Sequence, residues 1–268
     1  MLSIDWLGVV MLPCRPRLGT GHVMAHYRAL ALTQAQPWHL RSVPVCSSTE
    51  LLLEDWLKAL HTTHLSRSYA VLAEHQTRAT GQRGRSWSAP RGGVWISAAL
   101  PWSSQMGQSA GLAGLALAVA LAEQLEKAGV SVRIKWPNDL LVNGAKLAGL
   151  LPRLVYRGAS LRLVRFGLGL NVTNPVPPNA TSLRWLKGKA AGSPPRWVAE
   201  AMVAMDRCLA WAQADQLSTC LAPAERRLWS DAWIDPKDGR SWTIQGLDAD
   251  GGLLLQRGST RRCLRRWG

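Results

Sequence analysis

The sequence lacks paired cysteines and the metal-binding motifs that use them. Its five cysteines are far apart and form no C-x-x-C pair. This spacing argues against a zinc ribbon or a disulfide framework and fits a reducing compartment. The closest two histidines, His61 and His64, have no acidic residue between them, as a zincin helix would require. We therefore expect ordinary helix or surface histidines and no metal site.

Hydrophobic runs long enough to cross a bilayer are also missing. The segment WLGVVML near the start is short and follows an aspartate, so it makes a poor signal peptide. The longest apolar run, AGLAGLALAVALA from Ala110, is shorter than a transmembrane helix and is followed by EQLEKAG. We expect this run to form a buried helix, and the protein to be cytoplasmic with no membrane partner.

Acidic residues are scarce relative to basic ones. There are 17 Asp and Glu against 32 Lys and Arg, which gives a formal net charge of +15. Such an excess attracts nucleic acid, anionic membranes or acidic proteins. The basic residues are scattered, apart from the arginines between Arg257 and Arg266. No helix-turn-helix pattern is present in residues 1–40. The positive charge therefore favours a nucleic-acid partner only slightly.

What the sequence does contain is a succession of strand and helix patterns. Ser47 and Glu50 have the spacing of a capping box, followed by an apolar helical stripe to Leu60. Two further helices are expected from about Gln105 to Ala128 and from about Pro195 to Ala214. Strands are expected at YAVLAEHQ, GVWISAALPW, VSVRIKWP and SLRLVRFGLGLNV. The order predicts an α+β domain at 41–222, after a poorly defined extension at 1–40 and before a small β module at 223–268.

A hairpin is the clearest local prediction. Asn143-Gly144 is a strong two-residue turn signal. With that turn, Leu141 opposes Lys146 and Asp139 opposes Ala148, which places Asp139 and Lys146 on one face of the sheet. Lys146 is either an edge-strand lysine at the surface or a cation that reaches a partner, and the small residues Ala148 and Gly149 leave room for a ligand.

The loop TGQRGRSWSAPRGG, residues 80–93, combines glycines, arginines and a tryptophan. It lacks the Lys-Ser/Thr ending of a Walker loop. Its four glycines, at positions 81, 84, 92 and 93, allow a backbone nest for an anion. Arg83 and Arg85 can hold anionic oxygens, and Trp87 can stack on a planar ring. The alternative is a solvated basic loop.

Several motifs together resemble one family. QTRATGQRGRSWSAPRGGVWIS, KWPND, KLAGLL and GLGLNV occur in this order after SST, over roughly Arg41 to Leu183. This part of the chain is similar to biotin protein ligase. The resemblance implies a class II synthetase-like catalytic domain, with a mixed or antiparallel sheet packed with helices, and a shortened SH3-like β module at the C-terminus.

The resemblance also implies an activity and its site residues. Biotin is activated with ATP and Mg²⁺ to biotinyl-5′-AMP, which then modifies a lysine of the biotin carboxyl carrier protein of acetyl-CoA carboxylase. The expected biotin-binding residues are Ser48, Thr49, Glu50, Gln76, Thr80, Gly81, Gln82 and Lys146. The expected ATP-binding and adenylate-binding residues are Arg83, Gly84, Arg85, Trp87 and Asn171. The expected catalytic residues are Lys146, Arg85, Asp139 and Asn138.

The sequence departs from the family pattern at three places. Glu50 replaces an asparagine of the family, so its function is expected to be that of a helix cap. Thr80 and Gln82 replace two arginines of the loop. The DNA-binding repressor domain has no counterpart, so we expect no specific DNA binding, and either a monomer or a homodimer. A lipoate ligase of the same fold and a nucleic-acid-binding protein stay open as alternatives.

Overall fold

The computed structural model of the chain describes residues 19–31, 35–60, 65–102 and 110–265. The segment WLGVVML, Cys14, the pair His61 and His64, Arg266 and the start of the helix expected from Gln105 lie outside the described residues. None of the helices in the described part combines the length and the apolar content needed to span a bilayer.

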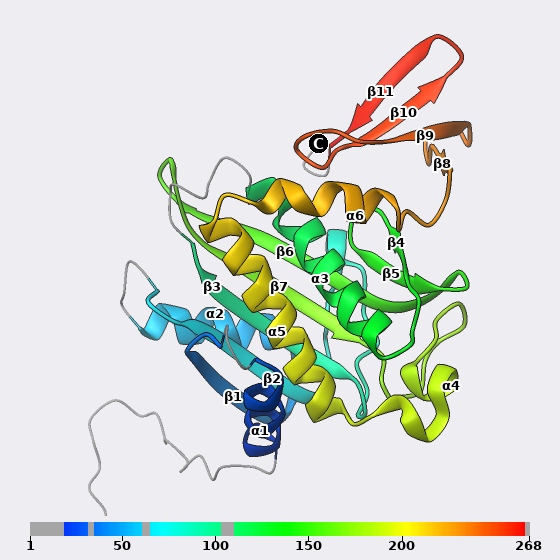
Figure 1. Ribbon diagram of the computed structural model, residues 1–268. Coiled ribbons are helices and arrows are strands. Elements are labelled where there is room, and N and C mark those ends of the chain that lie inside the picture. Colours follow the sequence, from blue (N-terminus) through cyan, green and yellow to red (C-terminus); the bar gives the residue numbers. More distant parts are fainter. Residues whose placement is uncertain (1–18, 32–34, 61–64, 103–109, 266–268) are drawn as a thin grey trace, which may run out of the picture.

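A seven-stranded mixed sheet forms the centre of the molecule (Figure 1). Its strand order is β1-β2-β3-β7-β6-β5-β4; β1 and β2 run parallel, and all other neighbours run antiparallel. The strands are β1 (Trp38–Cys46), β2 (Ser68–Gln76), β3 (Val94–Pro101), β4 (Arg133–Lys135), β5 (Asp139–Val142), β6 (Ala145–Arg157) and β7 (Ser160–Leu170). The expected α+β class is confirmed.

Helices cover both faces of this sheet. On one face lie α3 (Ala113–Lys127) and α5 (Pro194–Gln213), and on the other lies α2 (Thr49–Ala59), as Figure 1 shows. Because successive strand residues point to opposite faces, Ala70 and Leu72 join the α3–α5 core while Val71 joins the α2 core. The apolar run from Ala110 contains a buried helix, as expected. The helix ends at Lys127, and Gly129 follows its C-cap with a φ of 73°, which is typical of a C-terminal glycine.

Short helical segments complete this unit. They are η1 (Gln82–Gly84), η3 (Ala110–Leu112), α4 (Leu183–Lys187), η4 (Gly188–Ala191), η5 (Leu217–Cys220) and α6 (Leu221–Glu225).

The segment expected to be a poorly defined extension contains a packed helix. Helix α1 (Thr20–Leu30) lies against α5 (Figure 1), and the hydroxyl group of its Tyr27 donates to Asp206 at 2.5 Å. The indole of Trp38 donates to the same carboxylate at 3.0 Å. Burial raises the pKa of Asp206 to about 7, against the effect of these hydrogen bonds. The apolar periodicity of residues 20–30 is weak, since Val23, Tyr27 and Ala31 are buried in the core and Met24 is only partly buried against it.

The capping residue of α2 differs by one position from the expected capping box. Ser48, not Ser47, precedes the helix, and its hydroxyl group accepts a hydrogen bond from the Glu50 backbone N–H at 3.2 Å. The capping box of Ser47 and Glu50 was therefore wrong, although the helix itself is confirmed. The Glu50 side chain is left available for the pocket described below.

The hairpin between β5 and β6 contains a bulge that shifts the predicted register. Val142 pairs with Ala145 and Leu141 with Lys146, as expected. Beyond the bulge, Asp139 pairs with Gly149 instead of Ala148. Because one strand gains a residue at a bulge, turn spacing alone does not give the later pairs. Asp139 and Lys146 nevertheless meet.

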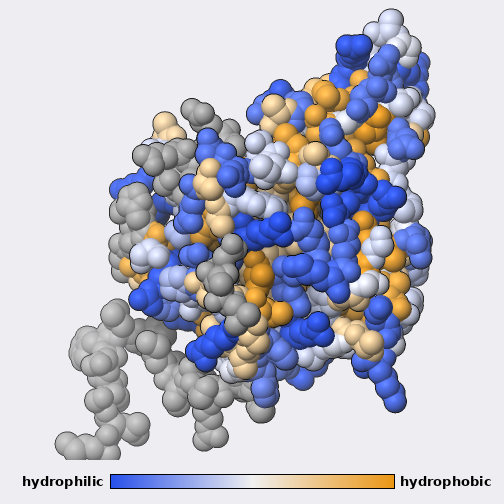
Figure 2. Space-filling view, viewed as in Figure 1, coloured by the Kyte–Doolittle hydropathy of each residue, from blue (hydrophilic) through white to orange (hydrophobic). Residues whose placement is uncertain are grey.

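A second, four-stranded antiparallel sheet follows α6, in the order β11-β10-β9-β8. Its strands are β8 (Ala232–Ile234), β9 (Ser241–Leu247), β10 (Leu253–Arg257) and β11 (Thr260–Leu264). Residues Trp242, Leu247, Leu253 and Leu255 belong to the same hydrophobic core as α3. Figure 2 shows apolar surface between hydrophilic residues in this part of the molecule. The expected small β module is confirmed, and its buried residues join the core of the larger unit.

Candidate functional site

An open pocket lies over two glycines of the large sheet. Gly149 of β6 pairs with Gly169 of β7, and the absence of side chains there leaves a flat floor. The Trp87 indole lies on this floor, since a Cβ atom at Gly149 or Gly169 would come within 3.0 or 2.8 Å of its ring. The ring of Trp95 packs edge-on against it, with centroids 6.4 Å apart. Trp87 Nε1 is buried without a hydrogen-bond partner. Trp87 thus forms one wall of the pocket.

The charged end of the pocket is formed by the β5–β6 hairpin. Lys146 Nζ lies 2.7 Å from the Asp139 carboxylate, and the side chain of Lys146 stays 32% exposed. The same ammonium group lies 4.7 Å from the centre of the Trp87 ring. A half-buried lysine with one acidic partner and an aromatic neighbour is held in one place, yet it can still contact a ligand. The interpretation of Lys146 as a lysine that reaches a partner is confirmed.

The backbone around Lys146 is held from both sides. Its N–H donates to Asn179 at 3.0 Å, and its carbonyl accepts from Thr181 N–H at 2.9 Å. The side-chain amide of Asn171 also donates to that carbonyl at 3.4 Å. Asn171 is buried and does not line the pocket. The contact of Asn171 with a nucleotide stays a prediction, and in this structure its side chain supports the backbone of Lys146.

The neutral end of the pocket is a network of hydroxyl and amide groups. Gln76 accepts hydrogen bonds from the Thr49 backbone N–H at 2.7 Å and from the Thr49 hydroxyl group at 3.1 Å. The Thr49 hydroxyl group is also 2.8 Å from the hydroxyl group of Ser97 on β3. Ser48, at the N-terminus of α2, lines the same end. Neutral donors and acceptors fixed in this way suit an uncharged polar group of a ligand.

Glu50 lies in the pocket wall and takes part in an ion-pair chain. Its carboxylate is 2.9 Å from the guanidinium group of Arg165, which is also 3.3 Å from Glu54. Neither Glu50 oxygen has a directed hydrogen bond, so the contact with Arg165 is mainly electrostatic. The expectation that Glu50 serves as a helix cap was wrong, because Ser48 fills that position and the Glu50 side chain turns to β7.

The loop after β2 folds back as a small hairpin. Thr80 pairs with Ser86, and the Gly81 N–H donates to the Arg85 carbonyl group at 2.7 Å. Arg83 and Gly84 form the exposed tip, with φ angles of 56° and 70°, and neither lines the pocket. Arg85 is exposed but does line it.

The four loop glycines do not form one nest. Gly92 packs against Thr173 and Asn174, and Gly93 packs against the ring of Trp95. Of these four glycines, Gly81 alone lines the pocket. The glycines at 92 and 93 give room for packing instead of anion binding.

Most of the residues expected from the sequence meet in this pocket. Those that line it are Ser48, Thr49, Glu50, Gln76, Thr80, Gly81, Gln82, Arg85, Trp87, Asn138, Asp139 and Lys146. Those that do not are Arg83, Gly84 and Asn171.

Three residues of this region escaped the sequence analysis. Ser97 is a buried hydroxyl in an otherwise apolar strand, and Arg165 is a charge within the apolar pattern of β7. Such a polar residue on a core strand is a usable signal, since burial without a partner is costly. Trp95 gave no such signal, because an aromatic residue in a strand is ordinary.

Residues 43–171 match the model of the Biotin/lipoate A/B protein ligase family. The bifunctional ligase/repressor BirA of Escherichia coli (strain K12) is 32% identical over 154 residues, which cover 56% of this chain and 46% of that protein. A biotin--[acetyl-CoA-carboxylase] ligase of Mycobacterium tuberculosis is 36% identical over 121 residues, which cover 42% of this chain and 44% of the relative. The chain thus spans less than half of the length of these relatives.

Solved structures agree with the fold. The biotin protein ligase of Aquifex aeolicus, in complex with biotin and ATP, superposes with a TM-score of 0.71 and covers 85% of this chain and 95% of its own. The two sequences are 21% identical, so this likeness concerns the fold. The family motifs and the pocket lie in the same part of the chain. Residues 43–171 are therefore similar in sequence to the Biotin/lipoate A/B protein ligase family, and the pocket lies within this matching segment.

Proposed function

We propose that the protein is an ATP-dependent biotin protein ligase. It would join biotin to a lysine of the biotin carboxyl carrier protein of acetyl-CoA carboxylase and form an amide bond. The observation that carries the proposal is one pocket with a neutral hydroxyl–amide end and a charged Lys146–Asp139 end. Biotin has a neutral polar ring system at one end and a carboxylate at the other, which matches this polarity.

In the first step, the biotin carboxylate attacks the α-phosphorus of ATP. The bond between the α- and β-phosphates breaks, and pyrophosphate leaves with its electron pair. Lys146 would lie between the carboxylate and the α-phosphate, where it would offset negative charge that builds up in the transition state. Arg85, exposed at the rim, would bind a phosphate oxygen. Trp87 and the glycine floor would keep water from the mixed anhydride.

In the second step, the amine of the carrier lysine attacks the acyl carbon of biotinyl-5′-AMP. An amide bond forms, the bond from that carbon to the phosphate oxygen breaks, and AMP leaves. The attacking nitrogen loses a proton, and Asp139 is the carboxylate at this end of the pocket that can accept it. Asn138 is held beside it by its side-chain hydrogen bond to the Leu150 carbonyl at 2.6 Å.

Magnesium is part of the proposal as the ion that accompanies ATP. When bound, it would shield the charge of the triphosphate. The described residues contain no cluster of three acidic, histidine or cysteine side chains. Asp139 and Asn138 both line the pocket, and their side-chain oxygens would suit an ion whose other ligands are phosphates and water.

Mass spectrometry of a carrier domain tests the proposal. After incubation with enzyme, biotin and Mg-ATP, the wild-type protein should add one biotin to each carrier. Lys146→Ala should add almost none. Lys189→Ala is the matched control, because this exposed lysine lies in η4 and outside the pocket. Unmodified carrier with the wild-type enzyme would contradict the proposal.

A lipoate ligase is the second candidate, because the family model includes both activities by its description. The relative of Mycobacterium tuberculosis, which is named as a biotin--[acetyl-CoA-carboxylase] ligase, favours biotin. An equimolar mixture of biotin and lipoate in the same mass-spectrometric assay separates the two. A carrier that gains lipoate alone would replace the biotin proposal.

Sequence-specific DNA binding is not part of the proposal, despite the net charge of +15. Non-specific attraction to DNA falls steeply as salt increases. An electrophoretic shift assay at physiological salt should therefore give no sequence-dependent complex. A tight complex with one DNA sequence would overturn this expectation.

A further inference from the structure

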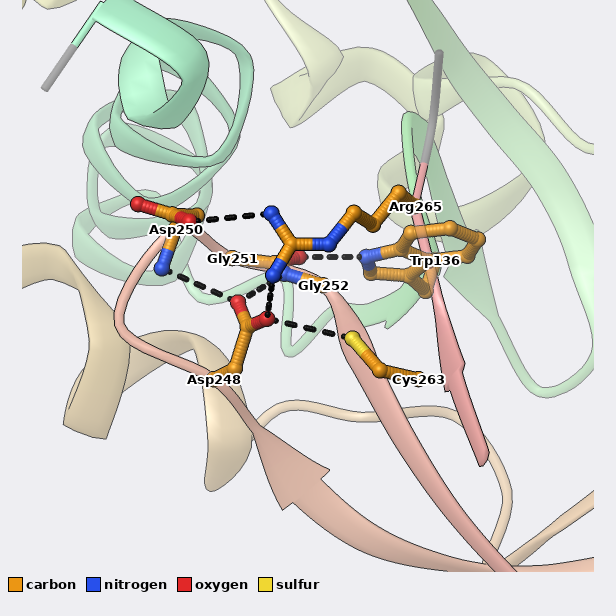
Figure 3. Close-up of polar contacts among 7 residues, drawn as sticks. All are labelled: Trp136, Asp248, Asp250, Gly251, Gly252, Cys263 and Arg265. Carbon is orange, nitrogen blue, oxygen red and sulfur yellow. Dashed lines mark hydrogen bonds and ion pairs between the residues drawn. The ribbon is translucent and has the colours of Figure 1, made fainter. Parts of the chain in front are cut away.

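The turn between β9 and β10, residues 248–252, contacts the turn between β4 and β5, which leads into the pocket. The carbonyl group of Gly251 accepts a hydrogen bond from Trp136 Nε1 at 2.9 Å (Figure 3). Gly251 has a φ of 81°, and a Cβ atom there would come within 2.7 Å of Leu115 and 2.9 Å of Leu112. The turn is therefore fitted between Trp136 and the start of α3, with no room for a side chain.

The same turn is stiffened from within. One oxygen of Asp248 accepts the backbone N–H groups of Asp250 and Gly252, at 2.9 and 2.7 Å. The other oxygen accepts from the Cys263 thiol at 3.1 Å and from Arg265 at 3.3 Å. Arg265 also pairs with Asp250 at 3.0 Å (Figure 3). Burial, followed by the nearby Asp248, raises the pKa of the Cys263 thiol, so the thiol stays a hydrogen-bond donor.

Trp136 connects this turn to the charged end of the pocket. It is followed by Pro137 and then by Asn138 and Asp139, which line the pocket. Asp139 holds the ammonium group of Lys146 at 2.7 Å. A displacement of Trp136 would move this segment by its backbone, whereas the Thr49–Gln76 network is held by α2, β2 and β3. The turn is thus connected to the charged end of the pocket by the short segment from Trp136 to Asp139.

We propose that Gly251 and Trp136 are positioning residues, through which the small sheet fixes Asn138, Asp139 and Lys146 for the reaction with ATP. The change in kinetics that we expect rests on the proposed function, whereas the change in structure rests on the contacts alone. Neither residue needs to touch a substrate. Their loss would weaken catalysis with ATP while biotin binding at the neutral end stays intact.

Two variants break the contact in different ways. Gly251→Ala places a methyl group against Leu115 and Leu112, and Trp136→Phe removes the indole N–H that Gly251 accepts. Gly258→Ala is the control for the first variant, since Gly258 also has a positive φ, 58°, and has open space around it. Trp185→Phe is the control for the second, because Trp185 is 69% exposed on α4.

Pyrophosphate release and hydrogen exchange provide the readouts. Both variants should lower kcat/KM for ATP by about tenfold, the scale expected for a small misplacement of reacting groups. The dissociation constant for biotin should stay within twofold, and both controls should match wild type. The backbone amides of residues 138–142 should exchange faster than in wild type in both variants and at the wild-type rate in both controls. This result does not depend on the identity of the substrate.

The outcomes separate the two proposals. A wild-type protein that releases no pyrophosphate with biotin would contradict the proposed function, and hydrogen exchange would still decide this inference. If Gly251→Ala does not fold, Trp136→Phe decides it. Unchanged exchange at residues 138–142, or an equal loss of ATP and biotin binding, would overturn the positioning role.

Discussion

The two ends of the pocket are built in different ways. The neutral end depends on Ser48, Thr49 and Gln76, which lie on adjacent elements and are joined by direct hydrogen bonds. The charged end depends on a bulged hairpin, on buried supports such as Asn171, and on the contact of Trp136 with a distant sheet. The neutral end is therefore held by hydrogen bonds between its own residues, whereas the charged end also depends on packing outside the pocket. We expect the first to determine substrate affinity and the second to determine the rate.

The largest expected effect concerns Asp139 at the charged end. Asp139→Asn keeps the size of the side chain but removes the group that accepts a proton and pairs with Lys146. The rate of biotin transfer to the carrier should fall by about 10²-fold, within the range of general base catalysis. Biotin affinity should change little. Single-turnover transfer from preformed biotinyl-AMP measures the rate, and Asp55→Asn on the exposed side of α2 is the control. A wild-type transfer rate would remove Asp139 from the mechanism.

At the neutral end, Thr49→Val should have the opposite signature. The variant keeps the shape but loses the hydroxyl group that joins Gln76 to Ser97. Loss of one such hydrogen bond costs about 1 kcal/mol, so the dissociation constant for biotin should rise by roughly fivefold to tenfold. Turnover at saturating biotin should stay near the wild-type value. Calorimetry and steady-state kinetics measure the two quantities, and a loss confined to kcat would reverse the assignment of the two ends.

The loop that carries Gln82 tests how well the adenylate is retained. Thr80 and Gln82 are neutral in a loop that lines the pocket, where the family resemblance implies arginines. Gln82→Arg adds a cation that can bind a phosphate oxygen, and charge-assisted hydrogen bonds are about twice as strong as neutral ones. The release of biotinyl-AMP should therefore slow by several-fold. A filter-binding chase measures the release, and equal rates in the two proteins would show that Gln82 does not limit retention.

The smallest effect on catalysis is expected at Asp206, outside both ends. Burial raises its pKa to about 7, above about 3.9 for an unfolded chain. The folded protein therefore binds this proton more tightly, and the free energy of unfolding should fall as the pH rises from about 4 to 7. Asp206→Asn should remove this part of the pH dependence and leave kcat unchanged. Thermal unfolding from pH 5 to 8 measures it; each kcal/mol corresponds to roughly 2–4 °C. An equal pH dependence in both proteins would contradict the assignment.

The sequence was sufficient for elements whose signals are local. The stripe from Leu52 to Leu60 predicted α2, and the alternation around Ile134 predicted a strand with one buried face. The turn Asn143-Gly144 predicted the hairpin that joins Asp139 and Lys146. The resemblance to a known family made it possible to predict most residues of the pocket as well.

Features that depend on tertiary contacts were not predictable in this way. The bulge opposite Leu140 and Leu141 shifts Asp139 to Gly149, and no turn signal marks it. Helix α1 has a weak apolar pattern, and its place against α5 depends partly on the hydrogen bond from Tyr27 to Asp206, which local sequence does not reveal. Glu50 turned out to pair with Arg165, which lies more than a hundred residues away in the chain. Local spacing carries no information on such partners.

Pyrophosphate release is the most direct test of the central claim that this pocket activates biotin. The purified protein is incubated with Mg-ATP and with biotin, with lipoate, or with neither acid, and pyrophosphate is measured over time. Our account predicts release that depends on biotin and a background rate in the other two reactions. Release with lipoate alone, or none with either acid, would contradict it.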